Sequence, residues 1–411
     1  MFASVAASYS TKIVNIGMDE AHMIGRGRYY DLHGDTDKVK ILIEHIKKVS
    51  GIGKKYGLTL LIWSDMFFRL AAGDYYRSNA KIDESVKEQI PDNVELIYWD
   101  YYSTDRKHYD KMLSAHAKIK DGTWFAGGLW TWAGFAPHNA FSIATMREAM
   151  KACHAKGVEN VVMTMWGDNG AECSKFAVLP ALFMVAQMAR GIDDVETIHA
   201  NFEKEFGIPF EDFRALDLAG TQNDSAEAIY NPEKYLLYCD PFMGQFDNRV
   251  KPADAAGYAN CAARLAKHEH DADYGYLFRS LRALCAFLSV KADLGIRTRA
   301  AYLSGDKKAA KALCTDYDAA LERLDAFYAA YEQQWMHENK PQGFDVVDLR
   351  IGSQRQRLLH CRDRLLAYAE GRLDRIEELE EPVLDCCCEE TADGKAARAI
   401  FWHEIASANV I

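Results

Sequence analysis

The strongest constraint on the fold is a series of five short apolar segments that alternate with helical or loop stretches. The segments are Ile13–Met18, Leu58–Trp63, Val94–Trp99, Thr123–Trp132 and Val161–Trp166. Each has the composition and length of a buried strand, and each ends in or beside Trp, Asp, Glu or Tyr. Strands that alternate with helices predict a parallel sheet, and functional residues at every carboxyl end favour a (β/α) barrel. An open, doubly wound sheet is the alternative, although no GxGxxG or phosphate loop follows any of these strands.

The stretches between and beyond these segments predict helices. Apolar residues recur at helical spacing in Asp35–Lys55, Asp105–Lys120 and Ser142–Lys156, whereas the stretch that leads to Gly34 is predicted to be a loop. From about Ile192 no further strand is convincing. Long helical stretches dominate there: Tyr258–Lys267, Gly275–Leu294, Lys307–Met336 and Ile351–Leu379. We therefore predict a barrel domain over residues 1–195 and an all-α C-terminal domain over residues 196–411.

The overall composition restricts the classes of partner. With 49 basic and 60 acidic residues the formal charge is −11, and no basic run is interleaved with aromatic residues. Nucleic acid and anionic membranes are therefore poor candidate partners, and no apolar run approaches the roughly 20 residues that cross a bilayer. Except for Cys386, Cys387 and Cys388, the cysteines occur singly and at no zinc-site spacing. This usage favours a reducing compartment and predicts a cytoplasmic protein.

The first strand is followed by a pair of adjacent carboxylates. Asp19 and Glu20 follow Ile13–Met18 directly and precede a loop with Gly25 and Gly27. In parallel α/β proteins the loops at the carboxyl ends of strands carry the chemistry, because the sheet holds them in place. The two carboxylates are therefore candidate catalytic groups. The alternative is that one of them only caps a following helix.

Further aromatic and polar residues stand at the ends of the other strands. They are Trp63, Asp100, Tyr101, Tyr102, Trp130, Trp132, Trp166 and Asp168. Any single tryptophan is more often a core residue, but their shared place at strand ends favours a role in ligand binding.

Taken together, these motifs resemble family-20 glycoside hydrolases, the β-N-acetylhexosaminidases. The resemblance rests on IGMDEAH with GRGRYYD, then IWSD, YWDYY, GLWTWAGFAP and TMWGDNGAEC in that order. It continues through YCDPFMGQFD, NKPQGFDVVDLRIG and the closing SANVI, which resemble the C-terminal domain of one bacterial branch. The resemblance therefore extends over nearly the whole chain.

The resemblance implies an α/β fold with an incomplete (β/α)8 TIM-type barrel, strands four to eight, followed by the helical domain. The family's Asp-Glu pair ends the fourth strand, so its first three strand–helix units are expected to be absent here. An arginine from the first strand and a histidine from the third then have no counterpart, and Asn15 stands where the family usually has histidine. The unpaired edges of such a partial barrel suggest a homodimer.

The resemblance also implies how the chemistry is divided. Adjacent strand residues point to opposite faces, so Asp19 and Glu20 are not expected to flank one bond as acid and nucleophile. In resembling enzymes the substrate's own 2-acetamido oxygen is the nucleophile. Glu20 would protonate the glycosidic oxygen and later deprotonate water, and Asp19 would orient the amide N–H. No metal or other cofactor is required.

The remaining implied roles concern sugar binding. Tyr102, or Tyr101 as its rival, would donate to the acetamido oxygen, and Asp168, with Glu172 as an alternative, would bind sugar hydroxyls. The aromatic wall would consist of Trp63, Trp166 and Trp132, with Trp130 as a substitute for Trp132, and Asp100 would belong to the substrate-binding set.

The sequence thus predicts an exo-β-N-acetylhexosaminidase that removes terminal β-linked N-acetylglucosamine or N-acetylgalactosamine from a glycan with retention. One alternative is a catalytically inactive fragment of such an enzyme that only binds or self-associates. A different barrel glycosidase is a further alternative, but it gives no reason for the Asp-Glu pair and the tryptophans.

Overall fold

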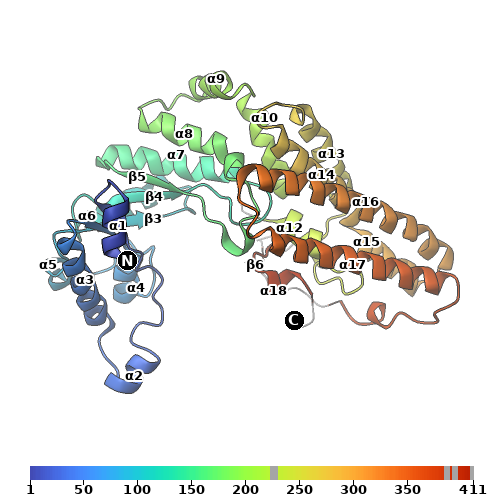
Figure 1. Cartoon of the computed structure of the whole chain (residues 1–411), viewed down its shortest axis with the longest axis horizontal. Coiled ribbons are helices and arrows are strands. Elements are labelled where there is room, and N and C mark those ends of the chain that lie inside the picture. Colours follow the sequence, from blue (N-terminus) through green and yellow to red (C-terminus); the bar gives the residue numbers. More distant parts are fainter. Residues whose placement is uncertain (223–229, 384–388, 391–396, 408–411) are drawn as a thin grey trace. The chain divides into compact units, whose positions relative to one another are not determined.

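The computed structural model describes residues 1–222, 230–383, 389–390 and 397–407 (Figure 1). Five parallel strands form one sheet in chain order: β1 (Ile13–Asn15), β2 (Thr59–Trp63), β3 (Val94–Trp99), β4 (Trp124–Gly128) and β5 (Val161–Thr164). In register, Val14 lies opposite Leu60, and Ile62 lies opposite Leu96. The predicted parallel sheet is confirmed. Its uninterrupted order fits an incomplete α/β barrel, whereas a doubly wound sheet reverses its order at a switch point.

Three strands end earlier than the sequence suggested. Residues 16–18, 129–132 and 165–166 lie outside the strands. After β1 the reason is local, because Gly17 and Met18 both have a φ of 75°. A pleated strand requires a negative φ, so the strand cannot continue through them.

Helices precede and connect the strands of the sheet. They are α1 (Phe2–Ser8), α2 (Arg28–His33), α3 (Lys38–Lys55), α4 (Asp65–Ala72), α5 (Glu84–Glu88), α6 (Arg106–Ala117) and α7 (Asn139–Lys156). Helices α3 and α6 begin at aspartates, since Asp37 accepts from the Val39 N–H and Asp105 from the Lys107 N–H, each at 2.9 Å. The helices predicted here are therefore confirmed. Helix α2 lies in the stretch predicted to be a loop.

The core around the sheet depends on a close approach of α3 to β2. Leu60, Ile62 and Leu96 are at most 1% exposed, and each such burial contributes about 1.5–3 kcal/mol. A Cβ atom on Gly53 would lie only 3.0 Å from a methyl carbon of Leu60. Glycine at this position therefore allows α3 to pack directly on β2.

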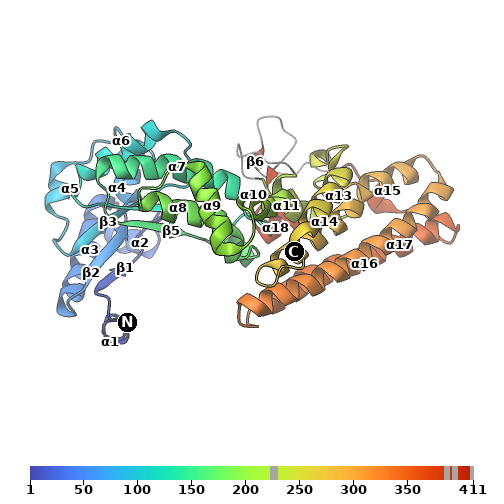
Figure 2. The same ribbon diagram turned by 90° about the horizontal axis from the view of Figure 1, so that it is seen from above.

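The remainder of the chain is mainly helical. It contains α8 (Leu179–Ala189), α9 (Val195–Phe206), α10 (Phe210–Arg214), α11 (Leu218–Thr221), α12 (Pro232–Tyr238), α13 (Asp254–Leu265), α14 (Gly275–Lys291), α15 (Leu294–Leu303), α16 (Lys307–Glu338), α17 (Phe344–Ala369) and α18 (Trp402–Ile405), with single 3₁₀ turns at Asp168–Gly170, Lys175–Val178, Ala215–Asp217, Asp247–Arg249, Ala266–His268 and Glu377–Leu379. The long helices α16 and α17 run side by side (Figure 2). The expected all-α C-terminal domain is not confirmed. Strands β6 (Glu389–Glu390) and β7 (Ala397–Arg398) form a short antiparallel pair.

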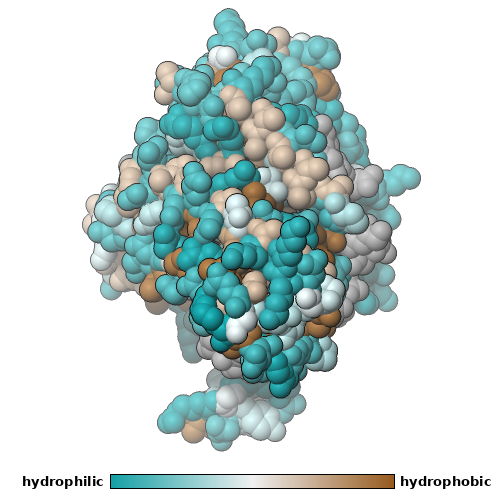
Figure 3. All heavy atoms as spheres, turned by 90° about the vertical axis from the view of Figure 1, so that its right-hand side faces the viewer, coloured by the Kyte–Doolittle hydropathy of each residue, from teal (hydrophilic) through white to brown (hydrophobic). Residues whose placement is uncertain are grey.

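Some expectations fall outside the described residues or concern the surface. Cys386–Cys388 and the last four residues of the SANVI motif lie outside the described parts of the chain. None of the helices described is both long and apolar enough to span a membrane. The face seen in Figure 3 is mainly hydrophilic, with scattered hydrophobic residues.

The chain forms two compact units whose segments interleave. The sheet unit comprises residues 1–128, 144–164 and 185–191, and the helical unit comprises residues 129–143, 165–184 and 192–411. The loops that follow β4 and β5 in the sequence therefore belong to the helical unit. The division at residue 195 stays a prediction about domains.

Candidate active site

The loop that carries the Asp-Glu pair continues from β1 along the edge of β2. The Ile16 N–H donates to the Leu61 carbonyl at 2.9 Å, and the Trp63 N–H donates to the Gly17 carbonyl at 3.1 Å. Beyond this point Met18 and Glu20 have φ values of 75° and 48°. Non-glycine residues rarely adopt a positive φ, and such strain concentrates at functional sites. The backbone geometry, like the sequence, therefore marks this loop as a candidate catalytic loop.

A buried aspartate at the start of α4 holds this loop. Asp65 is 0% exposed, and its Oδ2 atom accepts from the Glu20 N–H at 3.0 Å and from Arg69 Nε at 3.1 Å. Burial raises the pKa of the Asp65 carboxyl, and its hydrogen bonds and Arg69 oppose the rise. Arg69 also lies 3.7 Å from Glu20 Oε1, and the Glu20 side chain is 58% exposed. The backbone of Glu20 is thus held while its carboxylate stays accessible.

Asp19 lies on the exposed side of the same loop. Its Oδ1 atom is 3.6 Å from the place that a Cβ atom on Gly17 would occupy, so the Asp19 side chain folds back over this glycine. Because Gly17 also has a φ of 75°, a larger residue there would strain the backbone. Gly17 therefore fixes the path that places Asp19.

The carboxyl ends of β2 and β3 are supported by a buried hydrogen-bond chain. The Trp99 N–H donates to the Tyr75 hydroxyl, Tyr75 contacts Ser64 Oγ at 3.0 Å, and Ser64 Oγ lies 2.8 Å from His116 Nε2. His116 Nδ1 lies 2.7 Å from the Met112 carbonyl, and burial lowers the pKa of His116 to about 4. A neutral His116 therefore donates from Nδ1 and accepts from Ser64. Since Ser64 and His116 are 0% exposed, the pair is structural.

Asp100, predicted to bind substrate, lies beneath the loop after β3. It is 1% exposed and accepts from the Tyr98 hydroxyl at 2.8 Å and from the Tyr102 N–H at 3.0 Å. Its Oδ2 atom is also 2.9 Å from His108 Nε2. Asp100 thus holds the backbone of Tyr102. Because Asp100 itself is buried, it would affect a ligand indirectly, by positioning this loop.

The structure distinguishes between the two tyrosines after β3. Tyr101 is 6% exposed and stacks on Trp99 with the ring centroids 5.4 Å apart. Tyr102 is 46% exposed. Only Tyr102 therefore presents a large part of its side chain to solvent. Trp63, at the end of β2, is partly buried.

In the helical unit, Trp130 and Trp132 form one stacked pair. Their ring centroids are 4.2 Å apart, and Trp130 is 0% exposed against 6% for Trp132. The backbone of Trp130 is held on both sides, since its N–H donates to Ser142 Oγ and its carbonyl accepts from the His138 N–H. Trp130 is consequently an interior ring on which Trp132 packs.

Trp166 is the more accessible tryptophan of this unit, with 41% of its surface exposed. Its carbonyl accepts from Thr131 Oγ1 and from Lys175 Nζ, each at 2.7 Å. Lys175 Nζ also lies 2.9 Å from Thr131 Oγ1, and burial lowers the pKa of Lys175. These contacts connect the loop after β4 to the loop after β5.

Asp168 and Glu172 occupy different environments in the loop after β5. Asp168 is exposed as a residue, although partial desolvation of its carboxyl raises the pKa of that group. The positive charges of Lys175, Arg398 and Lys234 lower the same pKa and so oppose this rise. Glu172, the alternative partner for sugar hydroxyls, is 5% exposed and lies 2.6 Å from Lys234 Nζ. Asp168 is therefore the accessible carboxylate of the two.

A second buried acidic group lies near the tryptophan pair. Glu233 is 0% exposed, and its Oε1 atom accepts from the Ala136 N–H at 3.3 Å. Within the described chain, Glu233 Oε2 and both ring nitrogens of the buried His138 have no hydrogen-bond partner. Burial raises the pKa of Glu233 to about 7 and lowers that of His138 to about 4. At neutral pH His138 is therefore mainly neutral, and Glu233 is about half protonated.

Glu233 should make stability depend on pH. Its pKa rises from 4.5 to about 7 on folding, so between these values the folded state holds a proton that the unfolded state has released. Raising the pH from 5 to 8 should therefore lower the free energy of unfolding by about 3 kcal/mol more in the wild type than in Glu233→Gln. Urea unfolding at both pH values measures the difference. The exposed Glu322→Gln should follow the wild type. Equal pH dependence in the wild type and Glu233→Gln would contradict this assignment.

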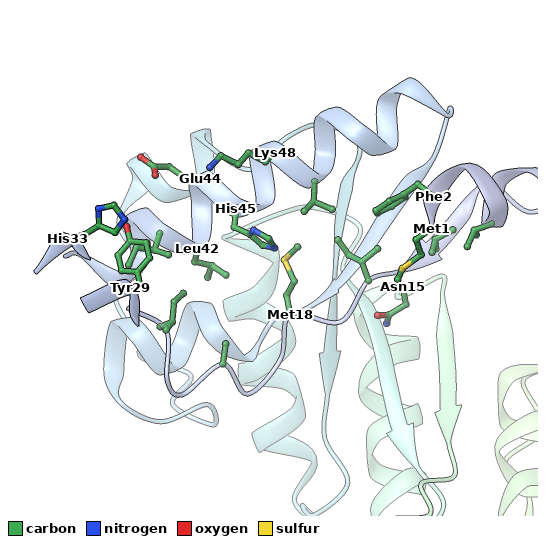
Figure 4. A pocket seen from close by; sticks show the side chains of 17 residues that line it. Met1, Phe2, Asn15, Met18, Tyr29, His33, Leu42, Glu44, His45 and Lys48 are labelled. Atoms are coloured by element: carbon green, nitrogen blue, oxygen red, sulfur yellow. The ribbon is translucent and has the colours of Figure 1, made fainter. Parts of the chain in front are cut away.

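A cavity of about 1100 Å³ lies beside the loop after β1, and Asp19 and Glu20 are not among its lining residues (Figure 4). Its lining comes from α1, β1, the loop after β1, α2 and α3, with Met18 and His45 projecting into it. Met18 and Ala21 flank the two carboxylates in sequence, yet neither Asp19 nor Glu20 lines this space. The cavity is mainly apolar and contains none of the predicted sugar-binding residues.

The predicted residues therefore form two groups. Asp19, Glu20, Trp63, Asp100 and Tyr102 belong to the sheet unit, and Trp130, Trp132, Trp166 and Asp168 belong to the helical unit. Sequence reasoning gave no role to Asp65 or Arg69. The available signal was the IWSD motif at the end of β2, with an arginine one helical turn after its aspartate. Among the described residues no group of His, Cys, Asp and Glu has the geometry of a metal site.

Comparisons with known proteins give one family match and two structural likenesses. Residues 209–398 match the family described as the Glycoside Hydrolase 20C C-terminal domain. No curated protein matches the chain in sequence.

Two solved structures illustrate the structural likenesses. A GH138 enzyme targeting pectin rhamnogalacturonan II gives a TM-score of 0.36 at 10% identity, covering 85% of this chain. The chain spans 60% of the length of that enzyme. A mutant of the Thermobaculum terrenum O-GlcNAc hydrolase gives a TM-score of 0.38 at 10% identity, with 88% of this chain and 74% of that chain covered.

Proposed function

We propose that the chain acts as a β-N-acetylhexosaminidase, and the match of residues 209–398 to the Glycoside Hydrolase 20C C-terminal domain family supports this proposal. The proposed reaction removes terminal β-linked N-acetylglucosamine or N-acetylgalactosamine from a glycan with retention of configuration. The observation that carries the proposal is the strained Asp19-Glu20 loop at the carboxyl end of β1, with the Glu20 backbone held by Asp65.

In the first step Glu20, as a carboxylic acid, transfers its proton to the glycosidic oxygen while the bond from C1 to that oxygen breaks. The substrate's 2-acetamido oxygen forms a bond to C1 from the opposite face and gives an oxazolinium ion. Asp19 accepts a hydrogen bond from the amide N–H, which orients the amide and stabilises its developing positive charge. The adjacent carboxylates then have different roles, so they need not flank the bond at the spacing of an acid–nucleophile pair.

In the second step water attacks C1 and gives its proton to the Glu20 carboxylate, while the bond from C1 to the acetamido oxygen breaks and restores the 2-acetamido group. Two successive inversions at C1 produce net retention. Arg69, 3.7 Å from Glu20 Oε1, complements the carboxylate form of Glu20, which is the base of this step.

The other residues are proposed to bind the sugar. The Tyr102 hydroxyl donates to the acetamido oxygen, and Asp100 contributes by holding the Tyr102 backbone. Asp168 accepts from sugar hydroxyls. Trp63, Trp132 and Trp166 supply apolar surface for the acetamido methyl group and the sugar ring, and Trp130 supports Trp132 from behind.

Replacement of Tyr102 by Phe tests the proposed donor to the acetamido oxygen. Loss of one preorganised donor to a reacting oxygen lowers kcat by about 100-fold. We expect this loss for Tyr102→Phe and little change for Tyr101→Phe, whose ring is buried against Trp99. Steady-state kinetics on a chromogenic N-acetyl-β-glucosaminide compare the two variants. Equal losses in both would remove the distinction between the tyrosines.

The reaction itself is tested by changing the substituent at C2. The chain should hydrolyse 4-nitrophenyl N-acetyl-β-glucosaminide or its galacto isomer, and should not hydrolyse the β-glucoside that lacks the acetamido group. Proton NMR of the first product should show the β-anomer. Hydrolysis of the plain glucoside at a similar rate, or an α-anomer, would exclude substrate assistance. Binding of N-acetylglucosamine without turnover would identify a binding protein instead.

A further inference from the structure

The loop that carries Asp168 has a backbone that its own sequence does not favour. Asn169 and Ala171 have φ values of 46° and 49°, and Gly170 between them has a φ of 129°. Asparagine tolerates the left-handed region, but alanine does so at an energetic cost. Contacts from outside the loop must therefore hold this conformation.

Arg350, from α17, binds the centre of the loop. Its NH1 atom donates to the Asn169 carbonyl at 3.0 Å, and its NH2 atom donates to Asn169 Oδ1 at 3.1 Å. The guanidinium carbon also lies 5.0 Å from the ring centroid of Trp402, which is within the range of a cation–π contact. A Cβ atom on Gly170 would lie only 2.9 Å from Arg350 NH1, so glycine is needed for this close approach.

Lys234, from α12, holds the end of the same loop. Its Nζ atom donates to Glu172 Oε2 at 2.6 Å, and it lies 3.5 Å from the Asn169 carbonyl. The Glu172 carbonyl accepts from the Tyr331 hydroxyl at 2.9 Å. The loop is thus fixed on both sides of Gly170 and Ala171.

The burial of these charges indicates that they serve more than stability. The side chain of Lys234 is 0% exposed, that of Glu172 is 4% exposed and that of Arg350 is 13% exposed. Two cations share one carboxylate in this cluster, and removing charges from water is costly. A buried ion cluster is weak support for stability, but it defines the geometry of the groups that it binds.

We propose that Lys234 and Arg350 are positioning residues that hold loop 167–172 so that Asp168 can bind a hydroxyl group of the sugar. This inference rests on the proposed function. It assigns part of the sugar recognition to helices α12 and α17, which follow the loop by about 60 and 180 residues in the sequence. Both residues act through the loop and neither touches the reacting atoms.

The main test uses Arg350→Lys, which keeps the charge but loses the planar fork of donors. A second variant, Lys234→Met, keeps the length of the buried chain. Arg355→Met is the matched control, because Arg355 lies on the same helix and is 47% exposed, and its one ion-pair partner among the described residues is the exposed Asp325. Circular dichroism melts show whether each full-length variant is folded.

Two readouts separate the inference from the proposed function. Hydrogen–deuterium exchange of a peptide spanning residues 165–173 reports the loop without any substrate, and it should become about tenfold faster in Arg350→Lys. Kinetics on the N-acetyl-β-glucosaminide should show KM raised about tenfold with kcat nearly unchanged, because a hydroxyl contact binds ground and transition states alike. Arg355→Met should match the wild type in both.

Each other result counts against the inference. Unchanged exchange in Arg350→Lys and in folded Lys234→Met would show that the contacts do not hold the loop, whatever the activity. Faster exchange with an unchanged KM would separate the loop from sugar binding. If the wild type shows no turnover, fluorescence titration with N-acetylglucosamine replaces KM. Absence of both turnover and binding in the wild type would overturn the proposed function, and with it the sugar role of the loop.

Discussion

Replacing Glu20 by Gln should lower kcat/KM for an N-acetyl-β-hexosaminide by about 10²- to 10⁴-fold. Glutamine cannot release a proton to the glycosidic oxygen, although it keeps nearly the same volume and the same backbone N–H. Because that N–H donates to Asp65 and the Glu20 side chain is 58% exposed, the fold should be unaffected. The measurement is steady-state kinetics beside a thermal melt.

The leaving group identifies the step that Glu20 assists. An aryl leaving group with a low pKa needs little protonation, so Glu20→Gln should impair it much less than an alkyl glycoside or a disaccharide. Glu44→Gln, an exposed carboxylate on α3, should behave as the wild type with both substrates. An equal loss with good and poor leaving groups would mean that Glu20 is not the general acid.

The parallel sheet was predictable from the sequence because each strand is a compact apolar run. Leu60, Ile62 and Leu96 belong to such runs and are buried in the core. Asp37 and Asp105 are typical helix-capping residues and mark the beginnings of α3 and α6. These are local signals, so the residues that give them stand close together in the sequence.

The supports of the candidate site were not predictable in the same way, because they depend on contacts between distant parts of the chain. The hydrogen bond from the Glu20 N–H to Asp65 joins residues that are 45 positions apart and follows from the pairing of β1 with β2. The contact of Arg350 with Asn169 spans 181 positions. No periodicity or motif encodes such a pairing, and the positive φ of Met18 and Glu20 has no signature in their residue types.

The structure decides between some candidate residues because it shows which side chains are buried, and a single sequence does not show this. Tyr101 and Tyr102 are adjacent and chemically identical, but only Tyr102 is substantially exposed. Asp168 and Glu172 were both candidates for binding hydroxyls, and Glu172 is buried beside Lys234. The sequence therefore located the strand ends at which candidates occur. The structure shows which of their side chains are accessible.

The largest effect on stability is expected at Asp217, which lies at the N-terminus of α7. Its Oδ1 atom accepts from the Asn139 N–H and from Asn139 Nδ2, each at 2.9 Å, and its Oδ2 atom accepts from the Ala140 N–H at 2.8 Å. Asp217 is 3% exposed, and burial raises its pKa to about 6, so at pH 7 it is mainly ionised. The carboxylate thus satisfies helix N–H groups that no intrahelical carbonyl can reach, at the positive end of the helix dipole.

Asp217→Ala should lower the free energy of unfolding by about 3 kcal/mol, because it leaves buried donors without an acceptor. Asp217→Asn keeps one acceptor oxygen and should lose less. The matched control is Asp194→Ala, which removes the exposed cap of α9 and its single backbone bond, to the Thr197 N–H at 2.9 Å, and should cost about 1 kcal/mol. Urea unfolding at pH 7 measures all three. If Asp217→Ala cost no more than Asp194→Ala, the buried carboxylate would contribute no more than a surface cap, because water or a local shift would satisfy the donors it leaves.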